Sequence, residues 1–294
     1  MAAPTSFTSF DTTPFALSQW GNAQKPKMIL IGIHGFCGAS NDFTGLATQL
    51  TSQLETLCVY AYNLRGMGLD PVPSRIGDID NPDYWIRDLQ SLVLRLKLQH
   101  PQSKIICCGE SLGALIALHT CAYFQKKFPC DGLVLLSPVV SLEHHISSLK
   151  LTIAHTIARI SPTVRIPMQR LIGDQTVKVT QASDNHLAQS QTNPWHVSSF
   201  TLRSLSAIVG YIQSASQSLQ QLTTPSLIIY GGKDFFTSPR DVETFIKHAP
   251  DSAKPASHYF PDAYHLLLYD TQASKIFQLI ADWLELSYCQ PARF

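Results

Sequence analysis

The sequence predicts an α/β protein with a doubly wound, mostly parallel sheet, and three observations lead to that prediction. Short apolar runs rich in Val, Ile, Leu and Tyr recur along the chain, and most lack the polar alternation of a half-exposed strand. Segments with apolar residues at helical spacing lie between these runs. This alternation of strand and helix favours parallel strands joined by right-handed helical crossovers.

Six apolar runs bounded by Gly, Pro or polar residues are the expected strands, and five helical segments are expected between and after them. The strands are expected at 28–33, 57–62, 104–108, 132–136, 226–231 and 257–260. The helices are expected at 41–54, 83–99, 111–128, 239–249 and 273–287. The segment 111–128 is nearly all apolar at its start, which is typical of a helix buried at the centre of a sheet.

The region from Ser141 to about Leu222 breaks the alternation, because no strand is expected there. Helical pieces are expected instead at 148–160, 168–174 and 196–220. An insertion of roughly 80 residues is too long for a bare loop in a compact domain, so a small helical cap is expected. The predicted organisation is therefore a core domain of residues 1–140 and 223–294 with a cap at 141–222.

The composition excludes several classes of protein. Hydrophobic residues make up 45% of the 294 residues and charged residues 15%, which indicates a globular protein. A net charge of +1 without a Lys/Arg run argues against nucleic acid as a partner. No apolar run approaches ~20 residues, so no helix is expected to span a membrane. The N-terminus lacks the features of a signal peptide, and the seven scattered cysteines resemble buried free thiols, so a cytoplasmic location is expected.

A candidate nucleophile stands between an expected strand and an expected helix. Gly109-Glu110-Ser111-Leu112-Gly113 fits the pattern G-x-S-x-G in the context that gives this motif its meaning. Such a turn forces the serine into a strained backbone conformation, and side chains two residues before and after it would collide with neighbouring backbone. The helix that begins after the serine points free N–H groups at any anion formed there. The alternative is a small residue in an ordinary tight turn.

The serine hydroxyl needs a base that takes its proton during attack. His265 is the predicted base, because it lies on a loop just after the last expected strand. The other histidines considered lie within that strand, on a helix, or at the start of the cap: His258, His248, His144 and His145.

A carboxylate is expected to hold the tautomer of the histidine and to stabilise the imidazolium. Asp234 follows the expected strand 226–231 by a few residues. The chain order Ser111, Asp234, His265 is the order of nucleophile, acid and base that accompanies the G-x-S-x-G motif. Asp262 is a rival, although a carboxylate three residues before the histidine more often caps a turn.

Two backbone N–H groups are expected to face the oxyanion that forms during attack. One is predicted to be that of Leu112, and the other that of Phe36 in the loop after the first expected strand. Gly35 would let this loop approach closely, and His34 is expected to order the loop by hydrogen bonding. Gly35 and Glu110 are also predicted to contact the substrate.

Together these residues resemble the α/β-hydrolase superfamily, and within it the monoacylglycerol-lipase-like, serine-aminopeptidase-S33-like group. The matching stretches extend in order through most of residues 28–285: IHGFCGASNDF, YNLRGMGLD, CGESLGALIAL, LVLLSP, IIYGGKDFFTSP and AYHLLLYD. The resemblance implies an eight-stranded, mostly parallel sheet with a helical cap inserted after the sixth strand, and a Ser-Asp-His hydrolase that forms an acyl-enzyme. Glu110 departs from the family pattern, since several relatives have His there, and Phe36 and Cys37 stand where many have smaller residues.

The expected function is hydrolysis of carboxylic esters by a carboxylesterase or a monoacylglycerol or lysophospholipid lipase. No metal or organic cofactor is expected, because this chemistry uses only side chains and water. The expected partner is a small ester, most simply an acyl lipid.

Two alternatives stay open: a non-catalytic binding protein on the same fold, and an amide-cleaving aminopeptidase, for which Asp174 or Asp184 would bind the substrate amine. The apolar face of 147–160, with Lys150 and Arg159 nearby, suggests transient contact with a membrane surface or packing on the core, and packing is preferred.

Overall fold

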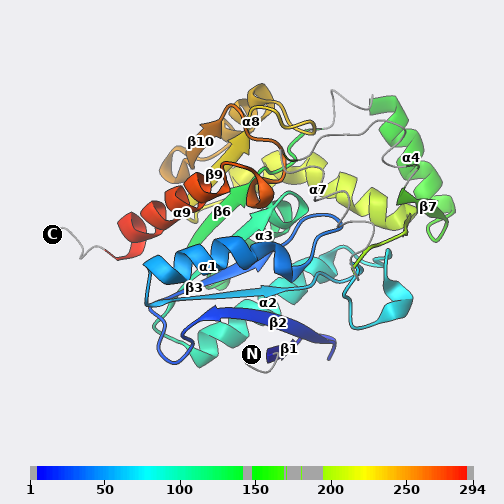
Figure 1. Cartoon of the computed structure of the whole chain (residues 1–294). Coiled ribbons are helices and arrows are strands. Elements are labelled where there is room, and N and C mark those ends of the chain that lie inside the picture. Colours follow the sequence, from blue (N-terminus) through cyan, green and yellow to red (C-terminus); the bar gives the residue numbers. More distant parts are fainter. Residues whose placement is uncertain (1–4, 142–147, 169, 171–179, 181–194, 290–294) are drawn as a thin grey trace.

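A computed structural model describes residues 5–141, 148–168, 170, 180 and 195–289. Its main sheet has eight strands in the order β1-β2-β4-β3-β5-β6-β9-β10 (Figure 1). The strands are β1 (Thr5–Thr8), β2 (Pro14–Gly21), β3 (Met28–Ile33), β4 (Leu57–Tyr62), β5 (Lys104–Glu110), β6 (Gly132–Leu136), β9 (Ser226–Gly231) and β10 (Ala256–Phe260). β2 pairs antiparallel with β1 and β4, and every pairing from β4 to β10 is parallel. The predicted mostly parallel sheet is therefore confirmed.

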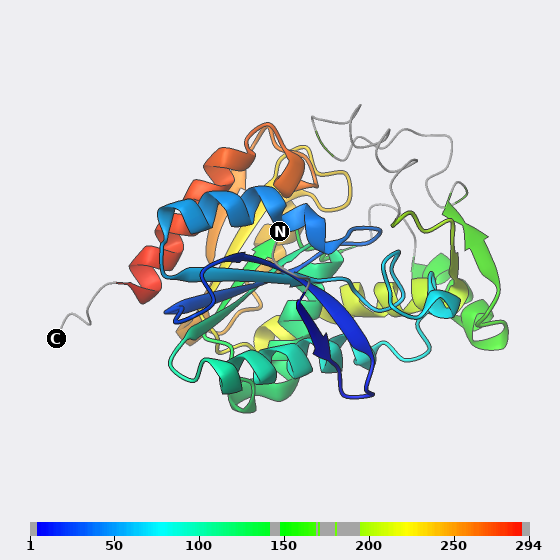
Figure 2. The ribbon, with the colours of Figure 1, turned by 60° about the horizontal axis from the view of Figure 1, so that its bottom comes forward.

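Helices cover both faces of this sheet (Figures 1 and 2). The α-helices of the described core are α1 (Thr44–Gln53), α2 (Asp83–Gln99), α3 (Leu112–Phe124), α8 (Pro239–Ile246) and α9 (Ala273–Tyr288). Short 3-10 helices occur at η1 (Ser40–Phe43), η2 (Pro73–Arg75), η3 (Gln125–Lys127), η4 (Asp251–Ala253) and η5 (Leu267–Tyr269). α1 and α9 pack on one face, whereas α2, α3 and α8 pack on the other. None of the helices in the described segments combines the length and apolarity that crossing a bilayer requires.

The central strands are buried on both faces, which explains why their sequences show no polar alternation. In β3, Ile29, Ile31 and Ile33 belong to the core under α2 and α3, while Met28 and Leu30 belong to the core under α1 and α9. Successive side chains of one strand thus enter two different cores, and both cores require apolar residues.

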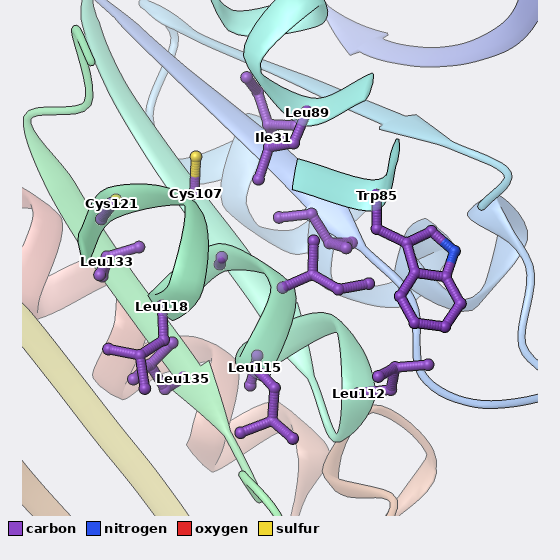
Figure 3. Close-up of a cluster of buried hydrophobic side chains, with 14 of the residues drawn as sticks. Ile31, Trp85, Leu89, Cys107, Leu112, Leu115, Leu118, Cys121, Leu133 and Leu135 are labelled. Atoms are coloured by element: carbon purple, nitrogen blue, oxygen red, sulfur yellow. The ribbon is translucent and has the colours of Figure 1, made fainter. Parts of the chain in front are cut away.

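Helix α3 lies in the middle of the larger core, as its apolar sequence predicts. Every residue from Leu112 to Ala122 is buried. Figure 3 shows Leu112 beside Trp85 of α2, and Leu118 beside Leu135 of β6. This burial holds the start of α3 rigidly against the sheet, and the start of α3 is where the candidate nucleophile lies.

The described part of the insertion contains α4 (Ser148–Ile160), α7 (Leu202–Gln220) and the short antiparallel strands β7 (Arg165–Pro167) and β8 (Ser199–Thr201). α4 begins and ends where the sequence predicts. The expectation of no strand in this region is wrong, because three-residue strands leave too little periodicity to detect. The predicted helix 168–174 lies largely outside the described residues, and the predicted cap limits of 141–222 stay a prediction.

Polar contacts attach the insertion to the loop after η2. Asp78 accepts hydrogen bonds from Thr201 Oγ1 at 2.6 Å and from Arg203 Nε at 2.7 Å. The Ile79 amide donates to Ser204 Oγ at 2.8 Å. The junction of β8 and α7 is therefore held at one place on the core.

Candidate active site

The carboxyl ends of β3, β5, β9 and β10 lie at the same edge of the sheet, because these strands are parallel. Ser111 follows β5, Asp234 lies three residues beyond β9, and His265 lies five residues beyond β10. The loop that begins at His34 follows β3. Residues far apart in the sequence converge at this edge, which is where open α/β sheets bind ligands.

Ser111 occupies a sharp turn that only glycine neighbours permit. Its φ is +55°, in the left-handed region that non-glycine residues seldom adopt. A Cβ atom at Gly113 would lie 1.9 Å from the carbonyl oxygen of Ile33, and one at Gly109 would lie 2.2 Å from that of Gly113. The backbone around the turn therefore excludes any side chain at positions 109 and 113, as the motif predicts.

A chain of hydrogen bonds joins three of the predicted residues. His265 Nε2 lies 2.8 Å from Ser111 Oγ, and His265 Nδ1 lies 2.7 Å from Asp234 Oδ2. A carboxylate oxygen can only accept, so Nδ1 carries the ring proton and donates it to Asp234. Nε2 is then left to accept from the Ser111 hydroxyl, which is the arrangement that general-base catalysis requires.

Backbone amides orient the Asp234 carboxylate. Its Oδ1 accepts from the Phe236 amide at 2.8 Å and from the Thr237 amide at 3.4 Å, and its side chain is only 1% exposed. The Phe236 ring packs edge-on against the His265 imidazole with ring centres 4.7 Å apart. The carboxylate and the imidazole are thus both held in place.

The environment of His265 favours its protonated form. Burial lowers the pKa of His265, but the charge and hydrogen bond of Asp234, together with the charge of Glu110, outweigh burial and hold the pKa above its ordinary value. An imidazolium formed during a reaction is therefore stabilised at this position.

The loop after β3 lies directly against the nucleophile. A Cβ atom on Gly35 would lie 3.2 Å from Ser111 Cβ, so this glycine permits the close approach. A turn follows, in which the Gly38 amide donates to the Gly35 carbonyl at 3.1 Å and Cys37 has a φ of +60°.

His34 orders this loop through both of its ring nitrogens. Its Nδ1 donates to the Gly35 carbonyl at 2.8 Å, and its Nε2 accepts from the Leu64 amide at 2.9 Å. Burial lowers the pKa of His34, which keeps the ring neutral in these two roles. Both ring nitrogens are occupied, so His34 has no free lone pair with which to act as a base.

The two predicted oxyanion donors, Phe36 and Leu112, directly follow the two residues that approach each other, Gly35 and Ser111. Leu112 is the first residue of α3, and amides in the first turn of a helix have no intrahelical acceptor. Phe36 belongs to the loop that approaches Ser111, and its ring packs on Phe200 of β8 with ring centres 4.4 Å apart. Their role as donors stays a prediction, whereas the contact of Phe36 with the insertion was not foreseen.

The rival residues lie elsewhere. Asp262 pairs with Lys233 at 2.9 Å, and its side chain is 69% exposed. His258 is exposed on β10, and His248 is exposed near Gln220. Among the described residues, no three His, Cys, Asp or Glu side chains are grouped to hold a metal ion. The remaining candidates lie outside the described residues: His144, His145, Asp174 and Asp184.

Glu110 makes a contact that the sequence does not reveal. The residue is 2% exposed, and its Oε1 accepts from the Leu268 amide at 2.9 Å. Burial raises the pKa of Glu110 to about 8, and the charge of Asp42 adds to this effect, although the bond from Leu268 opposes it. The partner is 158 residues away in the sequence, so no local pattern could have identified it.

The chain is similar to known proteins over most of its length. Residues 24–272 match the family model described as serine aminopeptidase, S33. A monoacylglycerol lipase from Mycolicibacterium smegmatis is 21% identical over 265 residues, which are 90% of each chain. A soluble variant of monoglyceride lipase from Saccharomyces cerevisiae, solved with a substrate analogue, is 20% identical, with a TM-score of 0.81 over 99% of this chain and 97% of that chain. A thermostable carboxyl esterase from Bacillus coagulans, solved with glycerol, is 17% identical, with a TM-score of 0.81 over 97% of this chain and 98% of that chain.

Proposed function

Because this chain belongs to the serine aminopeptidase S33 family and has the α/β-hydrolase fold, we propose that it is a serine hydrolase of carboxylic esters, with a monoacylglycerol or a similar acyl ester as substrate. A fold by itself admits many chemistries, so the proposal rests on the site. The observation that carries it is the continuous hydrogen-bond chain from Ser111 through His265 to Asp234. The names of the similar lipases and of the similar esterase support the same substrate class.

The first half of the proposed reaction transfers the acyl group to the enzyme. Ser111 Oγ forms a bond to the ester carbonyl carbon while His265 Nε2 takes the hydroxyl proton. The carbonyl electron pair moves onto oxygen, and the amides of Phe36 and Leu112 donate to the resulting oxyanion. When the carbonyl re-forms, the alkoxide leaves with the proton from His265, and Asp234 stabilises the imidazolium between the two transfers.

The second half returns the enzyme to its starting state. His265 Nε2 takes a proton from water, and the hydroxide oxygen bonds to the acyl carbon. The second oxyanion collapses by breaking the bond to Ser111 Oγ, which recovers its proton from His265. The products are a carboxylic acid and an alcohol, and the only co-reactant is water.

The test is a panel of p-nitrophenyl acyl esters, monoacylglycerols and amides assayed with the wild type and with Ser111→Ala. We expect the wild type to hydrolyse esters and to react covalently with a fluorophosphonate probe at Ser111. Removal of the nucleophile should lower kcat by about 10⁶-fold. A wild-type protein that neither hydrolyses these esters nor reacts with the probe would leave a non-catalytic binding protein as the better description.

The acyl chain length separates a lipase from a small-ester esterase. A series from acetate to palmitate should show a preference for longer chains if the substrate is a monoacylglycerol. A clear preference for acetate would favour the carboxylesterase, and faster cleavage of aminoacyl amides than of any ester would favour the aminopeptidase.

Contact with a lipid surface through α4 belongs to the same proposal. His155 on one face of α4 bonds to Ser206 of α7 at 2.6 Å, so that face packs on the protein. Ile153, Ile157 and Ile160 lie on the other face and are 51%, 49% and 77% exposed, a spacing typical of an interfacial helix. Co-sedimentation with phosphatidylcholine vesicles should weaken in Ile157→Glu, and equal sedimentation of both proteins would argue against docking.

Cell fractionation tests the cytoplasmic location expected from the sequence.

A further inference from the structure

Glu110 connects the strand of the nucleophile with the loop of the base. It is the last residue of β5, next to Ser111, and its carboxyl oxygen accepts from the Leu268 amide at 2.9 Å. Leu268 lies three residues after His265, in η5. A buried hydrogen bond therefore ties the backbone of the histidine loop to the residue that precedes the nucleophile.

A second carboxylate, which is partly buried, attaches the neighbouring residue of the same loop. Asp42, which follows the β3 loop, accepts from the Tyr269 hydroxyl at 2.5 Å and from the Ala39 amide at 2.9 Å. Asp270 accepts from the Tyr264 amide at 3.0 Å and so closes the loop on itself. Consecutive residues of η5 are thus attached to β5 and to the segment after β3.

The burial of Glu110 argues against the substrate contact that the sequence predicts for it. Its exposure of 2% leaves no surface for an ester, and its Oε1 accepts from the Leu268 backbone amide. The carboxyl group is also in an electrostatically unfavourable place, since its burial and Asp42 both raise its pKa. An acidic side chain buried at such a cost suggests a function in the site, because an apolar residue would be easier to bury.

We propose that Glu110 is a positioning residue, which holds the His265 loop through the Leu268 amide so that Nε2 stays within hydrogen-bond distance of Ser111 Oγ. This inference rests on the proposed ester hydrolysis. Misplacement of a catalytic group by about 1 Å can lower the rate by about 10²-fold. A base tied to the nucleophile strand by one buried bond is restricted in such movement.

Three substitutions at this position separate the hydrogen bond from the acidic group. Glu110→Gln keeps an oxygen that can accept from Leu268 and loses the acidic group. Glu110→Asp keeps the acidic group but is one methylene shorter, so it no longer reaches the amide. Glu110→Ala loses both. Since the pKa of Glu110 is raised to about 8, the neutral glutamine resembles the form that predominates at pH 7.

We expect kcat at pH 7 to fall about 10- to 100-fold in Glu110→Ala and Glu110→Asp, and clearly less in Glu110→Gln. KM should change little, because the base acts in the chemical step and does not bind the substrate. Equal losses of kcat in Glu110→Gln and Glu110→Asp would overturn the inference. A wild-type kcat in Glu110→Asp and Glu110→Ala would overturn it as well. If the alanine variant does not fold, the comparison of Gln with Asp decides.

A pH profile and the conservative variant together distinguish positioning from simple destabilisation. The titratable groups that act on Glu110 or respond to it are Asp42, His265, Tyr269 and Cys108. The charge of Glu110 raises the pKa of His265, but the pKa of Glu110 is itself raised to about 8, so its carboxyl group is mostly neutral where His265 titrates. Glu110→Gln should therefore keep both the midpoint of the ascending limb of kcat/KM and most of its plateau. A general loss of stability would instead lower the activity of Glu110→Gln as much as that of Glu110→Asp.

Asp131→Asn is the matched control, because Asp131 also accepts a backbone amide, that of Ile105 at 3.0 Å, near the opposite end of β5. Its kcat and pH profile should equal those of the wild type. If the wild type itself is inactive toward esters and toward the fluorophosphonate, the proposed function has failed. If the wild type is active and the Glu110 variants do not follow the expected order, only the positioning inference has failed.

Discussion

Replacement of Asp234 by Asn tests the tautomer of His265 with almost no change in side-chain size. Oδ1 of Asp234 accepts from the amides of Phe236 and Thr237, and in Asp234→Asn only the amide oxygen can continue to do so. The NH₂ group of the asparagine then faces His265 Nδ1 and donates to it. The ring must carry its own proton at Nε2, where it cannot take the proton of Ser111.

The size of the effect follows from the free energy needed to flip the asparagine side-chain amide, so that its oxygen and its NH₂ group exchange places. A reversed amide would accept from Nδ1–H and restore the active tautomer, but its NH₂ group would face two backbone N–H donors. The site is nearly closed to water, since the Asp234 side chain is 1% exposed. Each unsatisfied buried donor costs about 1–3 kcal/mol, which gives about 2–6 kcal/mol for the pair. At about 1.4 kcal/mol per factor of ten, kcat should fall by about 30-fold to 2 × 10⁴-fold.

The assay is the steady-state hydrolysis of p-nitrophenyl butyrate, with the rate of fluorophosphonate labelling as an independent measure of nucleophile activation. Thermal unfolding of Asp234→Asn should resemble that of the wild type, because the shape and most hydrogen bonds of the side chain are kept. A loss of less than tenfold in a folded variant would refute the assignment of Asp234 as the residue that sets the tautomer.

Three further predictions follow from the same geometry. Because the pKa of His265 is raised above 6.5 and only the neutral ring can take a proton, kcat/KM should increase with pH and reach half its maximum above pH 6.5; a midpoint below 6.5 contradicts this. Gly113→Ala places a Cβ 1.9 Å from the Ile33 carbonyl oxygen, so urea unfolding should show a loss of about 3 kcal/mol or more, and a wild-type midpoint would refute the steric argument. Asp262→Asn should leave kcat/KM within about twofold of the wild type, because Asp262 pairs with Lys233 in an exposed position; a large loss would favour Asp262 as the catalytic acid.

The elements found from the sequence are those whose pattern is strong and local. The run 28–33 is apolar throughout because β3 is buried on both faces, and α2 has the limits predicted from its helical spacing. β2 was not among the six apolar runs. It lies near the edge of the sheet and alternates, with Phe15 and Leu17 buried and their neighbours more exposed, so a search for uniformly apolar runs overlooks it.

In the candidate site, too, the sequence predicts the local features and does not predict the contacts between distant loops. The turn at Ser111 is a local feature, since its two glycines are needed by backbone atoms close to it. The contact of Phe236 with the imidazole and the bond from Leu268 to Glu110 join loops that follow different strands. Neither has a counterpart in the spacing of residues along the chain.

By itself, the sequence determined the alternation of strands and helices, the strained serine turn and the set of acids and bases that could serve it, because hydrophobic period, glycine placement and side-chain chemistry are properties of neighbouring residues. Only the tertiary structure decided that Asp234, and not Asp262, lies against His265, and that Glu110 is turned toward the histidine loop. Those choices depend on how the loops after β5, β9 and β10 meet at one edge of the sheet, and the meeting of loops is set by strand order and packing.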